Sequence, residues 1–511
     1  MSSSGLGQPP RFCIDLFAGA GGLSRGLRDA GFHHVLAVEK SEMAAHTFYE
    51  NIVRAHDGAP DIPWSAFHND ARDPTEQLRA QIAGGLAVAA TADVLREMDC
   101  VRQRIEAVRG ARGLSGTEVD LIAGGPPCQG FSLAGLRNPD DRRNSLPYEF
   151  LDFVTALMPK AVIVENVPGI GQAFRARGKK DSPLRDLLSA LDDYGYHPQV
   201  WRLNARHFGV AQNRPRIMIA ALRTDLLERA GVDVGKWPHE WTSRLRSKAT
   251  PGKHEQSALW AEEDIRLEPG DTCGVTEVPV SHVLEDLVTS GTYPERGNTE
   301  GSVGVHRGSS SPANHYLRRH GPRTTARFRL AAFLAARGYA DNLFHLASAE
   351  GGPEAVRRIV ADDPNPVMDP PLARALLDAG VNPTWPLASI ITALRTRKHS
   401  QRPLRKDSPA PTMMSLPDDH VHYAAPRTLT VREMARIQSF PDDFIFYGKE
   451  TTGSDRRRFE VPQYTQVGNA VPPRMAGAVA GHLHKVLDQI DAAISSPRDQ
   501  SSGEPALSRA G

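Results

Sequence analysis

Several features that would narrow the class of this protein are scarce in its 511-residue sequence. It has only four cysteines, Cys13, Cys100, Cys128 and Cys273, and no two of them form a CxxC pair. This spacing indicates neither a disulfide framework nor a zinc site, so we expect a reducing cytoplasm and no bound metal. No apolar run is long enough to span a bilayer, and residues 1–10 lack the apolar core of a signal peptide. We therefore expect no membrane association.

An excess of charge of one sign is also missing, because the formal net charge is only +1. A surface that binds nucleic acid would therefore be a local patch rather than a property of the whole molecule. With 40% hydrophobic and 24% charged residues, the composition is that of an ordinary globular protein. The length suggests two or three domains.

The first ordered stretch, residues 11–224, alternates short apolar runs with amphipathic ones, while residues 1–10 and 495–511 are polar and expected to be disordered. Segment 182–195 has the spacing of an amphipathic helix. Strands that alternate with helices predict an α/β fold with a doubly wound, mostly parallel sheet. The strand candidates are 11–17, 33–39, 120–125, 161–166 and 216–222.

The alternation is interrupted twice. Residues 74–117 are mainly charged, which favours a solvated surface helix in an insertion. Residues 225–426 are rich in Pro, Gly, Ser and Arg and predict a separate region, with helices near 325–338 and 353–380. Residues 427–494 again show a regular pattern. Residues 430–439 and 473–490 are predicted to be helices, the first with Thr430 as its N-cap.

A Gly-rich turn, DLFAGAGGLSRG (15–26), follows the first predicted strand. Glycines let a backbone approach a ligand closely, and the following helix offers free N–H groups, so adenosine-containing cofactors bind at such turns. The dinucleotide fingerprint G-x-G-x-x-G fits poorly, because Ser24 stands at its third glycine position. A purely structural turn is the alternative.

Two carboxylates follow this turn in the order that such a cofactor requires. Glu39 ends the second predicted strand, where it could accept the ribose hydroxyls. Asp70 stands where a third strand is expected to end, and it could accept from an adenine amino group. Alone, either residue could equally be a helix cap or a solvated charge.

The loop GGPPCQGFS (124–132) comes directly after the strand DLIA. Its glycines and prolines would hold Cys128 at the carboxyl edge of the sheet, where open α/β folds bind ligands. A thiol there can act as a nucleophile when its thiolate is favoured. The alternative is an inert buried cysteine, although Pro-Pro-Cys-Gln would be a poor core strand.

Three further segments carry polar groups at predicted sheet ends. AVIVENVPG (161–169) exposes Glu165, which next to a thiolate would form an acid–nucleophile pair. FGVAQNRPRIMIA (208–220) brings Arg214 and Arg216 before the next strand, where they could hold a base, a phosphate or Glu165. QVGNAVPP (466–473) is a turn that leads into a helix.

Together these segments resemble those of the DNA cytosine carbon-5 methyltransferases. DLFAGAGG, GGPPCQGFS, ENV, QNRPR and QVGNAVPP occur in that family's order, and RTLTVREMARIQSFPDDF (427–444) is similar to its penultimate motif. The resemblance covers about residues 11–224 and 427–490. It implies the fold of the S-adenosylmethionine-dependent methyltransferases. It also implies that residues 11–224 and 427–494 form one catalytic domain.

The resemblance also implies roles for individual residues. Cys128 would attack carbon 6 of a flipped-out cytosine, Glu165 would bind ring nitrogen 3 and the exocyclic amine, Arg216 would hold the carbonyl, and Arg214 would support the loop. Carbon 5 would then accept the methyl group. Residues implied at the cofactor site are Phe17, Gly19, Gly21, Leu23, Glu39 (ribose), Asp70 (adenine), Pro127 and Asn469.

Residues 225–426 stand where this family has its target-recognition domain. Two basic clusters predict contacts with phosphates and base edges. The first cluster comprises Arg318, Arg319, Arg323, Arg327 and Arg329, and the second Arg395, Arg397, Lys398, Arg402, Arg405 and Lys406. The residues expected to contact DNA are Gln129, Ser132, Gln212, Arg395, Arg397 and Lys398.

The function predicted on this basis is sequence-specific methylation of double-stranded DNA by a monomer, as the methylase of a restriction–modification system, with a separately encoded endonuclease as a possible partner. Three alternatives stay open. They are the same reaction on transfer RNA, a DNA-binding relative without catalysis, and a dinucleotide-dependent oxidoreductase.

Overall fold

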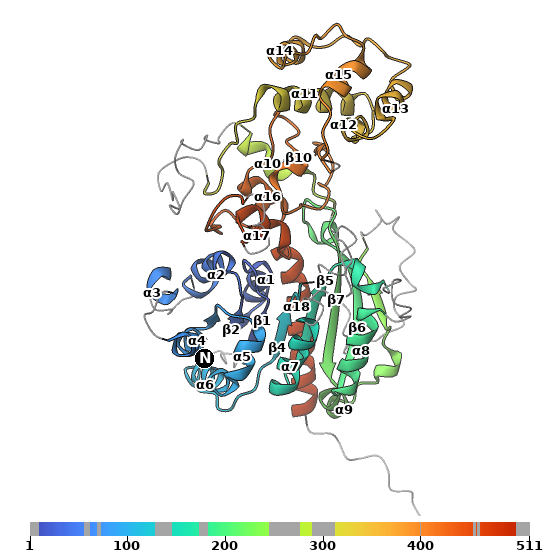
Figure 1. The fold of residues 1–511 in the computed structure, drawn as a ribbon. Coiled ribbons are helices and arrows are strands. Elements are labelled where there is room, and N and C mark those ends of the chain that lie inside the picture. The colour runs from blue at the N-terminus through green and yellow to red at the C-terminus, as the bar shows by residue number, and fades with distance from the viewer. Residues whose placement is uncertain are drawn as a thin grey trace, which may run out of the picture.

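The computed structural model describes residues 10–55, 62–68, 73–127, 146–172, 182–244, 276–288, 312–398, 400–452, 456 and 460–496. Its centre is an eight-stranded sheet of order β3-β2-β1-β4-β5-β7-β6-β8 (Figure 1). The strands are β1 (Arg11–Leu16), β2 (Phe32–Val38), β3 (Leu86–Ala87), β4 (Leu121–Gly124), β5 (Ala161–Asn166), β6 (Tyr196–Asn204), β7 (Pro215–Arg223) and β8 (Glu240–Thr242).

The first five strands run parallel to their neighbours, whereas β7 lies antiparallel between β5 and β6. The predicted mostly parallel α/β sheet is therefore confirmed. The chain moves outward from β1 in one direction to β2 and β3, and in the other direction to β4 and β5. Ligands bind at such a reversal, beyond the carboxyl ends of the strands. Because β7 is antiparallel, its first residues reach this same edge.

Helices cover both faces of the sheet, and alternate strand residues point into two apolar layers. One layer joins Cys13 of β1 to α1 (Gly22–Asp29), α9 (Thr224–Ala230) and the long C-terminal α18 (Pro473–Ser495). The other layer joins Phe12 and Ile14 of β1 to the helices of the opposite face. These are α4 (Pro74–Gly84), α5 (Thr91–Arg96), α6 (Met98–Gly110), α7 (Leu146–Leu157) and α8 (Pro183–Asp193).

Two expectations for residues 70–117 were wrong. Residues 74–117 do not form a solvated surface helix, because Val101 and Ile105 of α6 are fully buried against the sheet. Asp99, Arg102 and Glu106 are exposed on the outer face of this amphipathic helix, while Arg104 Nε donates to the carbonyl oxygen of Val35 in β2 at 3.0 Å. No strand leads to Asp70, since α3 (Trp64–His68) precedes it and the third strand, β3, comes later. Asp70 itself lies outside the described residues.

A third apolar cluster includes Ala18 and Ala20 of the Gly-rich turn. It joins α2 (Glu42–Phe48) and the π-helical turn Tyr49–Val53 to α10 (Val280–Leu284), α16 (Val431–Ile437) and α17 (Gln463–Asn469). Leu404, Ala410 and Met413 belong to this cluster although they fall within the predicted variable region. The bridged strands β9 (Arg402–Pro403) and β10 (His420–Val421) lie in the same stretch. Part of 225–426 is therefore packed against the framework formed by the sheet and its helices.

Residues 322–394 form a separate helical unit at one end of the molecule, remote from the sheet (Figure 1). It has its own apolar core, which includes Leu330, Phe344 and Leu376. Its helices are α11 (Pro322–Ala336), α12 (Leu343–Leu346), α13 (Gly352–Ile359), α14 (Pro370–Asp378) and α15 (Leu387–Ala393). Within the part of the chain that the structure describes, no helix has the length and apolar character needed to cross a bilayer.

Candidate active site

The Gly-rich turn lies at the carboxyl end of β1 and holds three residues at positive φ. Phe17 has φ 56°, Gly19 56° and Gly21 95°, a conformation that glycine adopts without strain. A Cβ atom on Gly21 would lie 3.1 Å from the side chains of Ile52 and Phe48. On Gly22 it would lie 2.3 Å from the carbonyl oxygen of Val471. The turn therefore packs directly on the QVGNAVPP segment, 450 residues later.

Glu39 stands at the end of β2 and faces this turn. Its Oε2 accepts a hydrogen bond from Gly19 N at 2.8 Å, and its Oε1 accepts one from Ser41 N at 2.7 Å. Burial raises the pKa of this carboxyl group, while hydrogen bonds from the backbone N–H groups of Ser41, Gly19 and Lys40 oppose the shift. A carboxylate has about four lone-pair sites, so beyond these three donors it can accept one from a ligand.

Asp15, at the carboxyl end of β1, is fully buried beneath the same turn. Its Oδ2 accepts from the hydroxyl group of Ser24, and its Oδ1 has no hydrogen-bond partner in the described part of the chain. Burial, reinforced by Glu39, raises the pKa of Asp15 to about 7. The sequence analysis missed Asp15 because an acidic residue inside an apolar strand is ambiguous without its surroundings.

Glu165 and Arg216 meet at the edge where β5 ends and β7 begins. Arg216 Nε lies 2.8 Å from Glu165 Oε1, and the two side chains are 10% and 13% exposed. A Cβ on Gly125 would lie 3.1 Å from Glu165 Oε2, so the loop after β4 passes close to this carboxylate. Asn166 Nδ2 donates to the carbonyl oxygen of Pro126 at 3.3 Å. The ion pair thus borders the loop that continues into Pro127.

The next residues of that loop are outside the described part of the chain. These are Cys128, Gln129 and Ser132. Pro127, which immediately precedes Cys128, is exposed at the carboxyl edge of β4. The roles predicted for these three residues stay predictions.

Arg214 is buried, and its guanidinium group binds backbone carbonyls instead of a carboxylate. Nη2 donates to the oxygens of Gly468 at 2.7 Å and Ala470 at 3.0 Å, and Nη1 donates to Met413 O at 3.2 Å. Desolvation and the nearby Arg216 hold the pKa of Arg214 well below its usual range. Arg214 therefore ties three distant segments together beside the Glu165–Arg216 pair.

The structure buries two predicted site residues, Gln212 and Leu23, and leaves a third, Asn469, exposed. Gln212 is fully buried, and its amide binds Gln438 Oε1 at 3.0 Å and Met413 N at 2.9 Å, so it cannot contact DNA in this conformation. The side chain of Leu23 lies in the core against α18 rather than at a ligand surface. Asn469 is exposed at the end of α17, next to the Gly468 carbonyl that Arg214 holds.

The architecture and these contacts can be set beside known proteins. A family model described as C-5 cytosine-specific DNA methylase matches residues 12–62, 98–302 and 354–485. The chain belongs to this family. It is therefore a DNA cytosine-5 methyltransferase, as the sequence predicted.

Individual relatives cover nearly the whole methylase. Type II methyltransferase M.DdeI of Desulfomicrobium norvegicum is 28% identical over 481 residues, which are 94% of this chain and 89% of the relative. Type II methyltransferase M.AgeI of Thalassovita gelatinovora is 29% identical over 489 residues, 91% of this chain and 97% of the relative. Among solved structures, a prophage-encoded DNA modification methyltransferase of E. coli matches with 19% identity and a TM-score of 0.47, covering 94% of this chain and 99% of that one.

A buried polar network missed by the sequence analysis joins the methylase framework to residues of the variable region. Thr430 caps α16, and its hydroxyl lies 2.8 Å from Nδ1 of the buried His315. His315 Nε2 lies 3.1 Å from the carbonyl oxygen of Leu287, so Nε2 carries the hydrogen and Nδ1 accepts from Thr430. Asn314, at φ 65°, donates to Phe446 O at 2.9 Å. No local periodicity marks these residues.

The basic residues predicted to contact DNA divide into paired and exposed ones. Arg323 and Arg327 donate to the carbonyls of Ala393 and Leu394, so they cap the end of α15. Arg395, Arg397 and Lys398 are exposed just beyond this helix end. Lys398 forms an ion pair with Asp418, and Arg395 donates weakly to Thr392 O at 3.4 Å.

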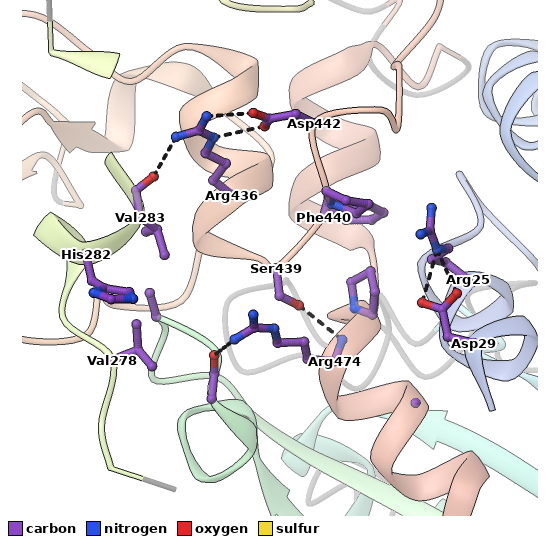
Figure 2. Close-up of a pocket in the computed structure, with 15 residues that line it drawn as sticks. Arg25, Asp29, Val278, His282, Val283, Arg436, Ser439, Phe440, Asp442 and Arg474 are labelled. Carbon is purple, nitrogen blue, oxygen red and sulfur yellow. Dashed lines mark hydrogen bonds and ion pairs between the residues drawn. The ribbon is translucent and has the colours of Figure 1, made fainter. Parts of the chain in front are cut away.

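A cavity of about 750 Å³ lies between α1, the turn after α16 and the start of α18 (Figure 2). Of the predicted catalytic and cofactor residues that the structure describes, none lines it. Figure 2 shows its arginines already engaged, Arg25 with Asp29 and Arg436 with Asp442. Ser439, at φ 67°, accepts from Arg474 N at 3.1 Å and so caps α18, which begins at Pro473 after the N-cap Pro472. The cavity is therefore distinct from the candidate active site.

Proposed function

We propose that this methylase transfers a methyl group from S-adenosylmethionine to carbon 5 of cytosine in double-stranded DNA, through a covalent adduct of Cys128. The observation that carries the proposal is the Glu165–Arg216 pair, 2.8 Å apart beside the Gly125–Pro127 loop. A carboxylate and a guanidinium at one sheet edge offer complementary contacts for a pyrimidine. Cys128 follows Pro127 directly in the chain.

The turn after β1 suits the cofactor. A close approach without a Cβ atom at Gly19, together with the Glu39 carboxylate facing it, fits an adenosyl group with a ribose diol. The unpartnered Oδ1 of Asp15 lies beneath the turn. Phe17, Glu39, Pro127 and Asn469 would hold the cofactor, which supplies an electrophilic methyl group when bound.

The residues of the chain would act in sequence on the cytosine. The Cys128 thiolate adds to carbon 6, forming an S–C6 bond, while Glu165 hydrogen-bonds ring nitrogen 3 and the exocyclic amine. Arg216 holds both Glu165 and the cytosine carbonyl. Carbon 5 becomes nucleophilic and gains the methyl group. A base then removes the proton from carbon 5, the S–C6 bond breaks, and Cys128 is restored.

This chemistry requires an extruded base, because carbon 6 is shielded within a stacked duplex. Extrusion costs a few kcal/mol, which contacts at the pocket must offset. We propose that residues 225–426 select the sequence, with Arg395, Arg397 and Lys398 on phosphates or base edges. The names of the Type II relatives support a role in a restriction–modification system, with a separately encoded endonuclease as partner, and we propose that the enzyme acts as a monomer.

A direct test combines bisulfite sequencing with trapping of the adduct. Plasmid DNA from cells that express the chain should carry 5-methylcytosine at one recurring sequence, and the Cys128→Ala variant should leave it unmodified while still binding S-adenosylmethionine. Duplex DNA with 5-fluorocytosine at that position should form a stable adduct with the wild-type protein alone. Turnover by Cys128→Ala would overturn the mechanism, and activity confined to transfer RNA would overturn the substrate.

A further inference from the structure

One side chain beside the candidate active site has no role in the mechanism above. Met414 is 38% exposed, and among the described residues from 400 to 496 it is the only large apolar side chain that exposed. A single exposed apolar residue is common and means little alone. The position of Met414 and the contacts that fix its backbone distinguish it from an ordinary exposed apolar residue.

The segment 410–415 runs between two predicted site motifs and is bonded to both. On one side, Ala410 O accepts from Asn213 N at 2.7 Å, and Met413 N donates to the Gln212 side chain at 2.9 Å. On the other side, Thr465 of α17 donates to Ser415 O at 3.2 Å. The backbone of Met414 is therefore fixed from both directions.

Met414 itself stands at the seam between these motifs. A Cβ on Gly468 would lie 2.5 Å from the carbonyl oxygen of Met414, so the two backbones touch. The neighbouring residue, Met413, is buried and its carbonyl binds Arg214. The side chain of Met414 stays in solvent while that of Met413 enters the core, which is the alternation of an extended chain.

The seam is joined to the Glu165–Arg216 pair through Arg214. Arg214, which holds Met413 O, is two residues before Arg216 and is influenced electrostatically by both Arg216 and Glu165. The exposed Asn469 follows Gly468 directly. The exposed, unbranched thioether of Met414 therefore stands on a chain segment that contacts two of the predicted site motifs. Methionine adapts its shape and makes favourable contacts with aromatic rings.

We propose that Met414 packs against the extruded cytosine nucleotide and helps to hold it outside the duplex. This inference rests on the proposed function, because it needs a base that leaves the helix. It makes Met414 a nucleotide-contacting residue that contributes apolar area where Glu165 and Arg216 contribute hydrogen bonds.

The experiment compares Met414→Ala and Met414→Leu with a matched control, Met158→Ala. Met158 is 40% exposed and precedes β5 at the amino edge of the sheet, opposite the site. Steady-state constants are measured on a short duplex that carries the sequence mapped by bisulfite sequencing. They are measured again on a duplex whose target cytosine is already mispaired.

We expect Met414→Ala to lower kcat/KM for DNA about tenfold, which corresponds to ~1.4 kcal/mol, on both duplexes. The KM for S-adenosylmethionine should stay within about twofold. Met414→Leu should recover most of the loss, and Met158→Ala should behave as the wild type.

Three results would overturn the proposal. They are a Met414→Ala enzyme equal to wild type on DNA, an equal loss in Met158→Ala, and a defect that disappears on the mispaired duplex, which would place Met414 against the unopened helix. Methylation of the duplex by the wild-type protein tests the proposed function separately. If the wild-type protein methylates no DNA, that function is refuted whatever the variants do.

Discussion

The sheet framework and the helical unit 322–394 differ in the kind of ion pair they contain. In the framework, Arg11 is 2% exposed and binds Asp120, Asp488 and Asp491, so buried ions join β1 to α18 across almost the whole chain. In the helical unit, ion pairs such as Arg374–Asp378 are exposed and lie four residues apart. Buried charges fix long-range geometry, whereas exposed pairs contribute little. The difference suggests that the framework holds a site rigidly while the unit is built from local contacts.

The strongest test of this comparison replaces one arginine in each region. Arg214→Met leaves the carbonyls of Met413, Gly468 and Ala470 without their donor. We expect a loss of roughly 3 kcal/mol in unfolding free energy together with loss of turnover. Arg374→Met should cost less than about 0.5 kcal/mol. Urea denaturation measures both, and equal costs would refute the comparison.

The second test is acidification, which should weaken the framework through its buried histidines. Burial lowers the pKa of His420 and of His422 from 6.5 to about 4. Between these values the unfolded chain binds protons that the folded chain does not, so stability is lost as pH falls from about 6.5 toward 4. At pH 5 the loss should be roughly 2 kcal/mol per histidine.

A double variant, His420→Gln with His422→Gln, provides the control for this pH effect. Its unfolding free energy should change less between pH 7 and pH 5 than that of the wild type. The same slope in both proteins would mean that other groups cause the acid sensitivity.

A smaller effect distinguishes two helix caps. Asp369 caps α14 in the helical unit by accepting from Leu372 N at 2.7 Å, and Thr430 caps α16 in the framework. Asp369→Ala should cost about 1 kcal/mol. Thr430→Ala should cost roughly 1 kcal/mol more, because it also leaves buried His315 Nδ1 without its donor. Thermal unfolding of both variants measures the difference, and a smaller cost at Thr430 would contradict it.

The smallest effect concerns binding rather than stability. Arg397 and Lys398 are both exposed, and Lys398 is paired with Asp418. We expect Arg397→Ala to weaken DNA binding and to reduce the slope of log K against log salt by about 1. Lys398→Ala should change the slope less, and neither should alter unfolding. Titrations at several salt concentrations test this, and a larger change for Lys398→Ala would reverse the assignment.

Local sequence predicted the elements on which this site is built. The runs at 11–17, 33–39, 120–125, 161–166 and 216–222 correspond to β1, β2, β4, β5 and β7. Their apolar patterns suffice because a strand buried on both faces reads as a continuous apolar run. β6 was missed since it carries Pro198, Gln199 and Arg202 among its apolar residues, and the pattern around Asp70 predicted a strand where none precedes it.

The sequence by itself determined the family, the mostly parallel sheet and the motifs that reach its carboxyl edge, because strand patterns and Gly-rich turns are local properties. Only the tertiary structure decided that Arg216 pairs with Glu165, that Gln212 is buried, and that Met414 stands exposed beside Gly468. The physical reason is that a polar side chain's role depends on partners hundreds of residues away. Whether such a side chain is buried or exposed is determined only when those segments pack together in the folded protein.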